Sequence, residues 1–217
     1  MGDMLPYLLQ TLLLGAVTTV GLTIASLVVA IILGFVLALM RRSGSMLLGG
    51  VARVYLEIFR NVPILTQLFI LYFGLARLGL TLPATVAAVL GFGLNGAAIL
   101  SEVFRASLNA VDRGQREAAL ALGMTPARAM VTIILPQAVR TALPPIGNFA
   151  IGLLKDTSLA SAAAVPELAF RAKMLVSETY LTSQIYLMVA VIYLAMSLPV
   201  AHLVKRAERR FTPQRAH

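Results

Sequence analysis

Long runs of apolar residues alternate with short basic segments along this chain. No charged residue occurs between Asp3 and Arg41, and at about 1.5 Å per helical residue such a run exceeds the roughly 30 Å hydrocarbon core of a bilayer. A helical span is therefore predicted from Leu12 to Met40, and we expect it to be retained because no basic segment precedes it. Further apolar stretches predict four more spans: Val62 to Ala76, Leu78 to Ser101, Thr141 to Leu154, and Thr179 to Val204.

Small residues recur at every fourth position of the first span, at Ser26, Ala30, Gly34 and Ala38. Residues four apart lie on one face of a helix, and small side chains there allow a second helix to approach closely. The stripe predicts a tight helix pair inside a bundle.

Composition agrees with a membrane protein. Hydrophobic residues make up 59% of the 217 residues, charged residues 12%, and the mean hydropathy is +0.88, whereas soluble domains contain about 25% charged residues. We therefore expect an all-α integral membrane protein in which residues 1–217 form a single transmembrane domain.

The positive charge orients this domain rather than indicating a nucleic-acid surface. The net charge is +9, and five spans place 14 of the 18 Lys and Arg residues on one side. Segments rich in Lys and Arg stay on the cytoplasmic side of a membrane. The N-terminus is thus predicted outside and the C-terminus in the cytoplasm. The basic residues assigned to that side are Arg41, Arg42, Arg53, Arg60, Arg105, Arg113, Arg116, Arg128, Arg140, Lys205, Arg206, Arg209, Arg210 and Arg215.

A polar segment at about residues 112–136 separates the third and fourth spans and predicts a helix, a turn and a second helix. Asp112 can cap the first helix, with Gln115 reaching back as in a capping box. Gly123 suits a left-handed turn at the end of this helix. Thr125 and Pro126 then supply a cap and a first-turn proline for the next helix.

The first polar helix has the composition of a docking element. Ala118, Ala119 and Ala121 leave its backbone accessible, and Leu120, Leu122 and Met124 add apolar surface. Such a helix suits a groove on another protein. The alternative is an amphipathic helix that lies at the membrane interface.

The spacing within this segment resembles a known motif. Glu117-Ala118-Ala119, Gly123 and Ile133-x-Leu135-Pro136 follow one another as in the EAA loop of membrane subunits of bacterial ABC importers. The runs IFRNVPILTQLFILYFG, from Ile58 to Gly74, and LLKDTSLAS, from Leu153 to Ser161, are similar to permease subunits of polar-amino-acid importers. The resemblance covers roughly residues 11–210.

This resemblance implies a permease of the type I ABC importer class, located in the inner membrane, which translocates polar amino acids by alternating access. It also implies two ABC-type ATPase subunits, a second permease chain, identical or related, and a periplasmic or lipid-anchored solute-binding protein. ATP and Mg would be bound by the ATPase, since this chain has no Gly-Lys dipeptide and hence no phosphate-binding G-x-x-x-x-G-K loop. The residues implied to couple this chain to the ATPase are Gly114, Glu117, Ala118, Ala119, Gly123, Ile133, Leu135 and Pro136.

Polar groups within the spans are candidates for the substrate path, because they are costly in lipid. The candidates are Asn61, Pro63, Gln67, Glu102, Asn148, Lys155, Asp156, Thr157 and Ser158. A polar amino acid needs a carboxylate for its ammonium group, which Glu102 or Asp156 can supply, and donors for its own carboxylate. Pro144-Pro145, with Gly147 and Gly152 beyond, predict a broken or re-entrant fourth span that lines a cavity.

Structural alternatives for the charged residues stay open at this stage. Glu57 and Arg60 can form an ion pair along one helix face, and Glu102 and Arg105 can form another. Lys155 and Asp156 can stabilise a bend or a contact between subunits.

Two other classes of function compete with an importer. A passive channel or a secondary transporter subunit would not need the polar helix pair. An intramembrane enzyme lacks its usual parts, because the chain has two His, no Cys, and neither an H-E-x-x-H nor a G-x-S-x-G motif. We therefore expect no catalysis and no metal or cofactor on this chain.

Overall fold

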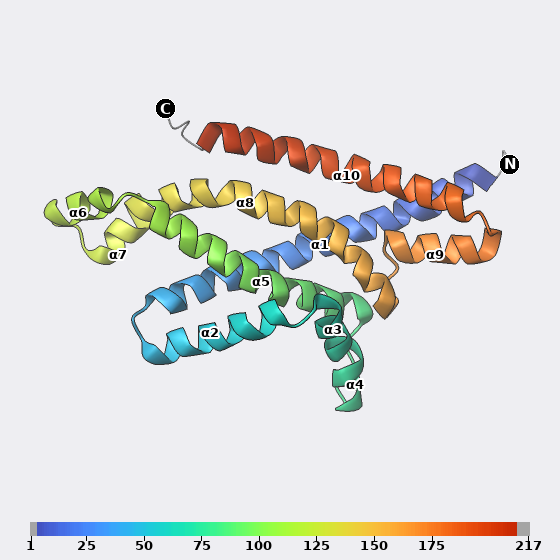
Figure 1. Ribbon diagram of the computed structural model, residues 1–217, viewed down its shortest axis with the longest axis horizontal. Coiled ribbons are helices and arrows are strands. Elements are labelled where there is room, and N and C mark those ends of the chain that lie inside the picture. Colours follow the sequence, from blue (N-terminus) through green and yellow to red (C-terminus); the bar gives the residue numbers. More distant parts are fainter. Residues whose placement is uncertain (1–3, 212–217) are drawn as a thin grey trace.

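The computed structural model describes residues 4–211, and this part of the chain consists of helices joined by short turns, without a strand (Figure 1). This agrees with the all-α prediction. The elements are α1 Met4–Arg42, α2 Met46–Asn61, α3 Ile64–Phe69, η1 Ile70–Gly74, α4 Leu75–Arg77, α5 Ala84–Ala110, α6 Arg113–Ala121, α7 Pro126–Ala129, η2 Met130–Ile134, α8 Leu135–Asp156, η3 Thr157–Ala163, α9 Leu168–Thr179 and α10 Thr182–Phe211.

Within residues 4–211, four helical runs are long and apolar enough to cross a membrane: Met4–Arg42, Ala84–Ala110, Pro126–Ala163 and Thr182–Arg210. A fifth pass exists if the bent pair Met46–Asn61 and Ile64–Arg77 counts as one. The predicted number of five agrees with this count. The chain begins at one end of the bundle, whereas α6, α7 and the end of α10 lie at the other (Figure 1).

The second span differs from its prediction, because the helix breaks at Val62-Pro63, where the span was expected to begin. The two halves meet at an angle of 105°. Gln67 of α3 holds this bend: its Nε2 donates to the carbonyls of Phe59, at 3.0 Å, and Val62, at 2.7 Å. Asn95 of α5 donates to the same Phe59 carbonyl at 2.7 Å. The terminal carbonyls of α2 are thus satisfied by side chains, as the end of a helix in an apolar environment requires.

The prediction of a short, broken fourth span is wrong. Residues 126–163 form one continuous helical run, and Pro144 and Pro145 lie inside α8. These prolines remove the donors for the carbonyls of Arg140 and Thr141, and both of those residues are exposed. A membrane helix tolerates proline where the freed carbonyls find other partners. The strong bend of the chain lies at Val62-Pro63 instead.

The small residues of the first span pack against α5, as predicted. Ser26, Ala30 and Ala38 are at most 1% exposed. A Cβ placed on Gly34 would lie 3.0 Å from the carbonyl oxygen of Ala97, and one on Gly93 would lie 2.6 Å from a methyl group of Val29. Residue numbers increase in the same direction along both helices at these contacts, so α1 and α5 run parallel.

Replacing Gly93 with alanine should destabilise the packing of α1 against α5, because the added methyl group would overlap the side chain of Val29, which is β-branched and has little rotamer freedom. We expect Gly93→Ala to lower the free energy of unfolding by about 1–3 kcal/mol, measured as thermal unfolding of the purified chain in detergent. Gly21→Ala is the matched control, since it changes the same residue within a helix but meets no atom within 4 Å. Equal thermal midpoints for the two variants would contradict the close packing.

Candidate functional site

The polar segment between α5 and α8 begins with a side-chain cap. Oδ1 of Asp112 accepts a hydrogen bond from the backbone N–H of Gly114 at 2.7 Å, which confirms the predicted cap of α6. Gln115 does not complete a capping box but extends to α8, where its Oε1 accepts from Nε2 of Gln137 at 3.4 Å. The cap therefore fixes the start of α6, and Gln115 joins it to α8.

Gly123 ends α6 in the left-handed conformation that its sequence position predicts, with φ of +77°. The N–H of Met124 donates to the carbonyl of Ala119 at 3.1 Å, and that of Gly123 to Leu120 at 2.9 Å. These two bonds form a Schellman motif. A residue with a Cβ is disfavoured at this φ by about 1–2 kcal/mol, so glycine gives the turn its shape.

The second polar helix also starts as predicted. The Thr125 side chain accepts from the N–H of Arg128 at 3.3 Å, and Pro126 occupies the first turn of α7. The chain then passes through the π-helical turn η2 into α8, with Pro136 in the first turn of that helix. Ile134 packs with Leu108 of α5 in a buried cluster. The helix pair is thus anchored on both α5 and α8.

Most residues of α6 and its C-terminal turn that were predicted to suit docking are exposed, and Ala119 is the exception. Glu117 and Ala118 are exposed, and the exposed fractions of Leu120 and Leu122 are 42% and 82%. Ala119, expected to be accessible, is 1% exposed. A small residue at position 119 therefore lets α6 pack closely on its own chain, and its neighbours carry the outward surface.

Glu102 lies at the centre of a cluster of ion pairs. Its carboxylate pairs with Arg41 of α1, with Arg105 of α5 at 2.7 Å, and with Arg60 of α2 at 4.0 Å. The expected Glu102–Arg105 pair is confirmed. Glu57 instead accepts a hydrogen bond from Asn61 at 3.0 Å. The carboxylate of Glu102 thus joins three helices at one point.

The structure does not bring the other predicted path residues into one site. Gln67 supports the bend after α2, beside Pro63, which directly precedes α3. On α8, Asn148 donates to Glu208 of α10 at 3.3 Å. The buried Thr157 donates to the carbonyl of Leu154 at 2.7 Å.

Two of the candidates do share a hollow. Lys155 and Ser158 line a space of about 430 Å³ between α8 and α10, together with Tyr193 and Ser197. Asp156 is exposed next to Lys155. An ammonium group, hydroxyl groups and a neighbouring carboxylate are therefore available along this part of the chain.

The sequence analysis missed Glu167, which lies outside the membrane-spanning runs, directly before α9, and is fully buried. Its carboxylate accepts from the N–H groups of Ala169, at 2.8 Å, and Phe170, at 2.7 Å, and from the Tyr193 hydroxyl at 3.4 Å. Burial raises the pKa of the Glu167 carboxyl, although these donors act in the opposite direction. Its position directly before an apolar helix was the available signal, because acidic residues often cap helices.

Comparison with known proteins agrees with this arrangement. Residues 30–213 match the family described as the inner membrane component of binding-protein-dependent transport systems. The chain belongs to this family. It is a multi-pass membrane protein and a transporter permease subunit.

The named relatives align with nearly the whole length of this permease. It is 42% identical to the probable amino-acid permease protein YxeN of Bacillus subtilis (strain 168), over 92% of this chain and 90% of the relative. It is 36% identical to the probable amino-acid ABC transporter permease protein YckA of the same organism, over 95% and 89%. A solved amino acid ABC transporter with histidines is 36% identical, with a TM-score of 0.89 over 96% of this permease and 97% of that chain.

The raised pKa of Glu167 predicts a pH dependence of stability. Its contribution is fully present below the ordinary pKa of 4.5 and is lost as pH rises through the higher folded-state pKa, because the folded permease holds this proton more tightly than the unfolded chain. Thermal unfolding of the wild type should therefore shift to lower temperature over this range, relative to Glu167→Gln. Glu178→Gln, which changes an exposed carboxylate of α9, should keep the wild-type slope. Parallel curves for wild type and Glu167→Gln would contradict the assignment.

Proposed function

We propose that this permease is the membrane-spanning subunit of an ABC importer that moves polar amino acids across the inner membrane by alternating access. A separate ATPase drives it, and a solute-binding protein supplies the substrate. The observation that carries the proposal is the capped elbow of α6 and α7, which presents an exposed helix at one end of the bundle.

The elbow is attached to α5 and α8 by several contacts, so a movement of α6 would be passed on to both helices. Ala119 is buried, Gln115 bonds to Gln137 of α8, and Ile134 packs against Leu108 of α5. A partner that holds the exposed Leu120 and Leu122 therefore moves the ends of two membrane helices together. ATP and Mg belong on that partner, and two such ATPases serve two permease chains.

A second permease chain, identical or related, completes the path. Five passes from one chain are few to enclose a polar route, and the arm formed by α3, η1 and α4 projects from the bundle (Figure 1). Apolar side chains are exposed on this arm, including Ile70 and Phe73, at 56% and 53%. Such a surface is suited to packing against a neighbouring chain or lipid.

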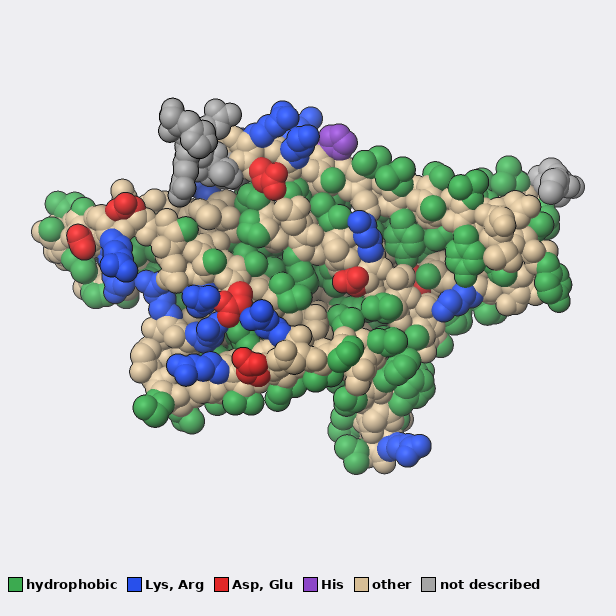
Figure 2. Space-filling view, in the orientation of Figure 1, with side chains coloured by type: hydrophobic (Ala, Val, Ile, Leu, Met, Phe, Trp, Pro, Cys, Tyr) green, Lys and Arg blue, Asp and Glu red, His purple; other side chains and the backbone are tan. Residues whose placement is uncertain are grey.

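Charge supports the orientation with the N-terminus outside and the C-terminus in the cytoplasm. Figure 2 shows most Lys and Arg side chains gathered over the half of the molecule that holds α2, α6 and the end of α10. The positive-inside rule makes this half cytoplasmic. The solute-binding protein then delivers its cargo at the opposite face, near α9.

Amino acids are the substrate class that the relatives' names and the histidines of the similar transporter suggest. In this permease, Asp156 can accept from an α-ammonium group, and Lys155 and Ser158 can donate to a carboxylate. Lys155 and Asp156 are the last two residues of α8, and Ser158 lies at the start of η3.

The turn at Gly123 tests the coupling role. Gly123→Val should misplace α6, because a β-branched residue disfavours φ near +77°, and transport should fall by about tenfold or more. Uptake and ATP hydrolysis are measured with the ATPase and binding protein in proteoliposomes. Gly44→Val is the matched control, since Gly44 also has a positive φ, of +71°, and open space around it, but lies between α1 and α2.

Wild-type transport by Gly123→Val would exclude the proposed role of the turn. Uptake that continues without ATP would instead support the channel or secondary transporter alternative.

The carboxylate of Asp156 tests the substrate path. Asp156→Asn removes a charged acceptor worth about 1.5–3 kcal/mol, so uptake of a polar amino acid should fall by about tenfold, and substrate stimulation of ATP hydrolysis should fall with it. Glu57→Gln, a similar change at an exposed carboxylate of α2, should leave both unaltered. Unchanged uptake by Asp156→Asn would remove this residue from the path.

A further inference from the structure

An apolar groove of about 520 Å³ runs between α1, α5 and α8. Its walls are apolar side chains from all three helices, among them Phe35, Phe104 and Val139. Val139 is 44% exposed, so the groove is open to its surroundings. These helices belong to three of the membrane-spanning runs, and the groove therefore faces the apolar part of a bilayer or another membrane segment.

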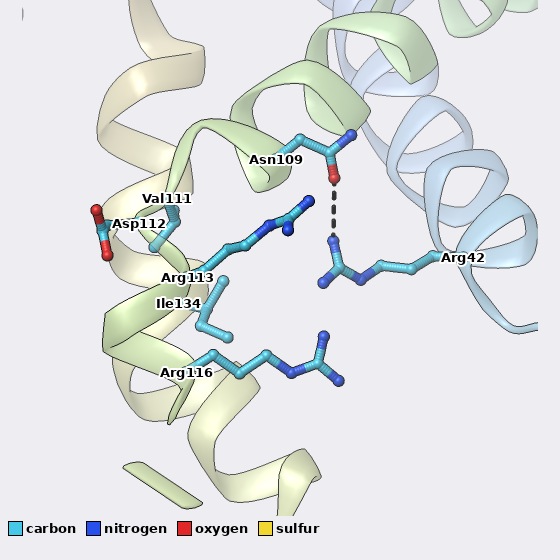
Figure 3. Close-up of a pocket in the computed structure, with 7 residues that line it drawn as sticks. All are labelled: Arg42, Asn109, Val111, Asp112, Arg113, Arg116 and Ile134. Carbon is cyan, nitrogen blue, oxygen red and sulfur yellow. Dashed lines mark hydrogen bonds between the residues drawn. The ribbon is translucent and has the colours of Figure 1, made fainter. Parts of the chain in front are cut away.

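A second hollow, of about 590 Å³, is basic, and two of its lining residues are next in sequence to residues that line the groove. Arg42 of α1 and Arg113 and Arg116 of α6 line it, and their guanidinium groups project into the same space (Figure 3). The Asp112 carboxylate points away from them in Figure 3 and is engaged in capping α6. Three positive charges therefore face the hollow, where no carboxylate points toward them among the side chains drawn.

Consecutive residues on two of the helical segments line the groove and the hollow. Leu108 lines the groove and Asn109 lines the hollow. Ile134 and Leu135 make the same transition at the start of α8. A mostly apolar groove and a cluster of cations are thus lined by neighbouring residues of the same helical segments.

Local electrostatics favour an anion in the hollow. Arg113 and Arg116 lie in the first turns of α6, where the partial positive charge of a helix N-terminus disfavours cations. The carboxylate of the cap, Asp112, is bound to the N–H of Gly114 and points away from the arginines (Figure 3), and the first turn itself has no acidic residue. A phosphate between these arginines would relieve the repulsion and accept several charge-assisted hydrogen bonds.

We propose that an anionic phospholipid binds here, with its phosphate between Arg42, Arg113 and Arg116 and an acyl chain in the groove. An acidic protein surface would match the hollow but would leave the groove unfilled. A second permease chain would cover the groove but would not account for the three arginines that line the hollow. The lipid alone fits both parts, and its position against α6 makes the coupling element sensitive to the surrounding membrane.

Native mass spectrometry of the full chain in detergent tests this site, with phosphatidylglycerol and phosphatidylcholine as probes. We expect tighter retention of phosphatidylglycerol by the wild type. Each basic residue near an anionic lipid strengthens binding by about fivefold, so a variant without the three charges should bind phosphatidylglycerol about a hundredfold more weakly at low salt. That variant combines Arg42→Gln, Arg113→Gln and Arg116→Gln.

A matched control removes three positive charges outside the hollow and should keep phosphatidylglycerol: Arg53→Gln, Lys205→Gln and Arg206→Gln. Val139→Trp fills the groove from its exposed side and should weaken retention of the lipid while leaving the hollow intact. Equal loss in both triple variants would overturn the proposal, since it shows that only the overall charge matters. Equal retention of the two lipids by the wild type would also overturn it, since it shows that the headgroup charge is not recognised.

The same variants identify other occupants in the complex with the ATPase. If the arginine variant keeps phosphatidylglycerol but releases the ATPase, the hollow binds an acidic protein surface and the lipid assignment is wrong. If Val139→Trp separates two permease chains without loss of lipid, the groove is a contact between subunits, which also overturns the proposal.

Discussion

The close, parallel packing of α1 against α5 constrains the rest of this fold. Two parallel helices in a membrane require the chain to return across the bilayer between them, and only residues 43–83 are available for that return. The chain uses α2 and the bent arm for it. Gly34 and Gly93 allow the backbones to approach closely, and Glu102 joins Arg41 to the returning segment through Arg60. The position of α2 and of the bend therefore follows from this pair.

Polar side chains act as joints where the helices change direction. Gln67 binds carbonyls at the end of α2, Glu102 gathers arginines from three helices, and Glu167 binds the first N–H groups of α9. An unsatisfied polar group costs far more in an apolar environment than in water, and the hydrogen bonds and ion pairs of these side chains favour one geometry of the helices that they join. This explains why several polar residues that resembled substrate contacts in the sequence have partners within the chain.

The sequence predicted the structure correctly where the conformation depends on hydrogen bonds between residues close together in the chain. Asp112, Gly123 and Thr125 cap and turn the polar helices through neighbouring backbone groups, and a reader of the sequence can foresee such bonds. The predictions failed where the backbone path depends on contacts between residues far apart in the chain. Pro144 remains in a continuous helix, because a proline in a membrane helix is compatible with more than one backbone path. The break after Asn61 has a local cause in Val62-Pro63, but it is also supported by Asn95, far along the chain, and that contact cannot be read from the local sequence.

The Schellman turn at Gly123 limits how α6 can be recognised. The carbonyls of Ala118, Ala119 and Leu120 already accept hydrogen bonds from Leu122, Met124 and Gly123, so this end of the helix has few main-chain groups to offer a partner. Selectivity must then come from the shapes of the protruding side chains. A small number of substitutions on that surface is enough to change which partner fits, while the internal framework stays the same.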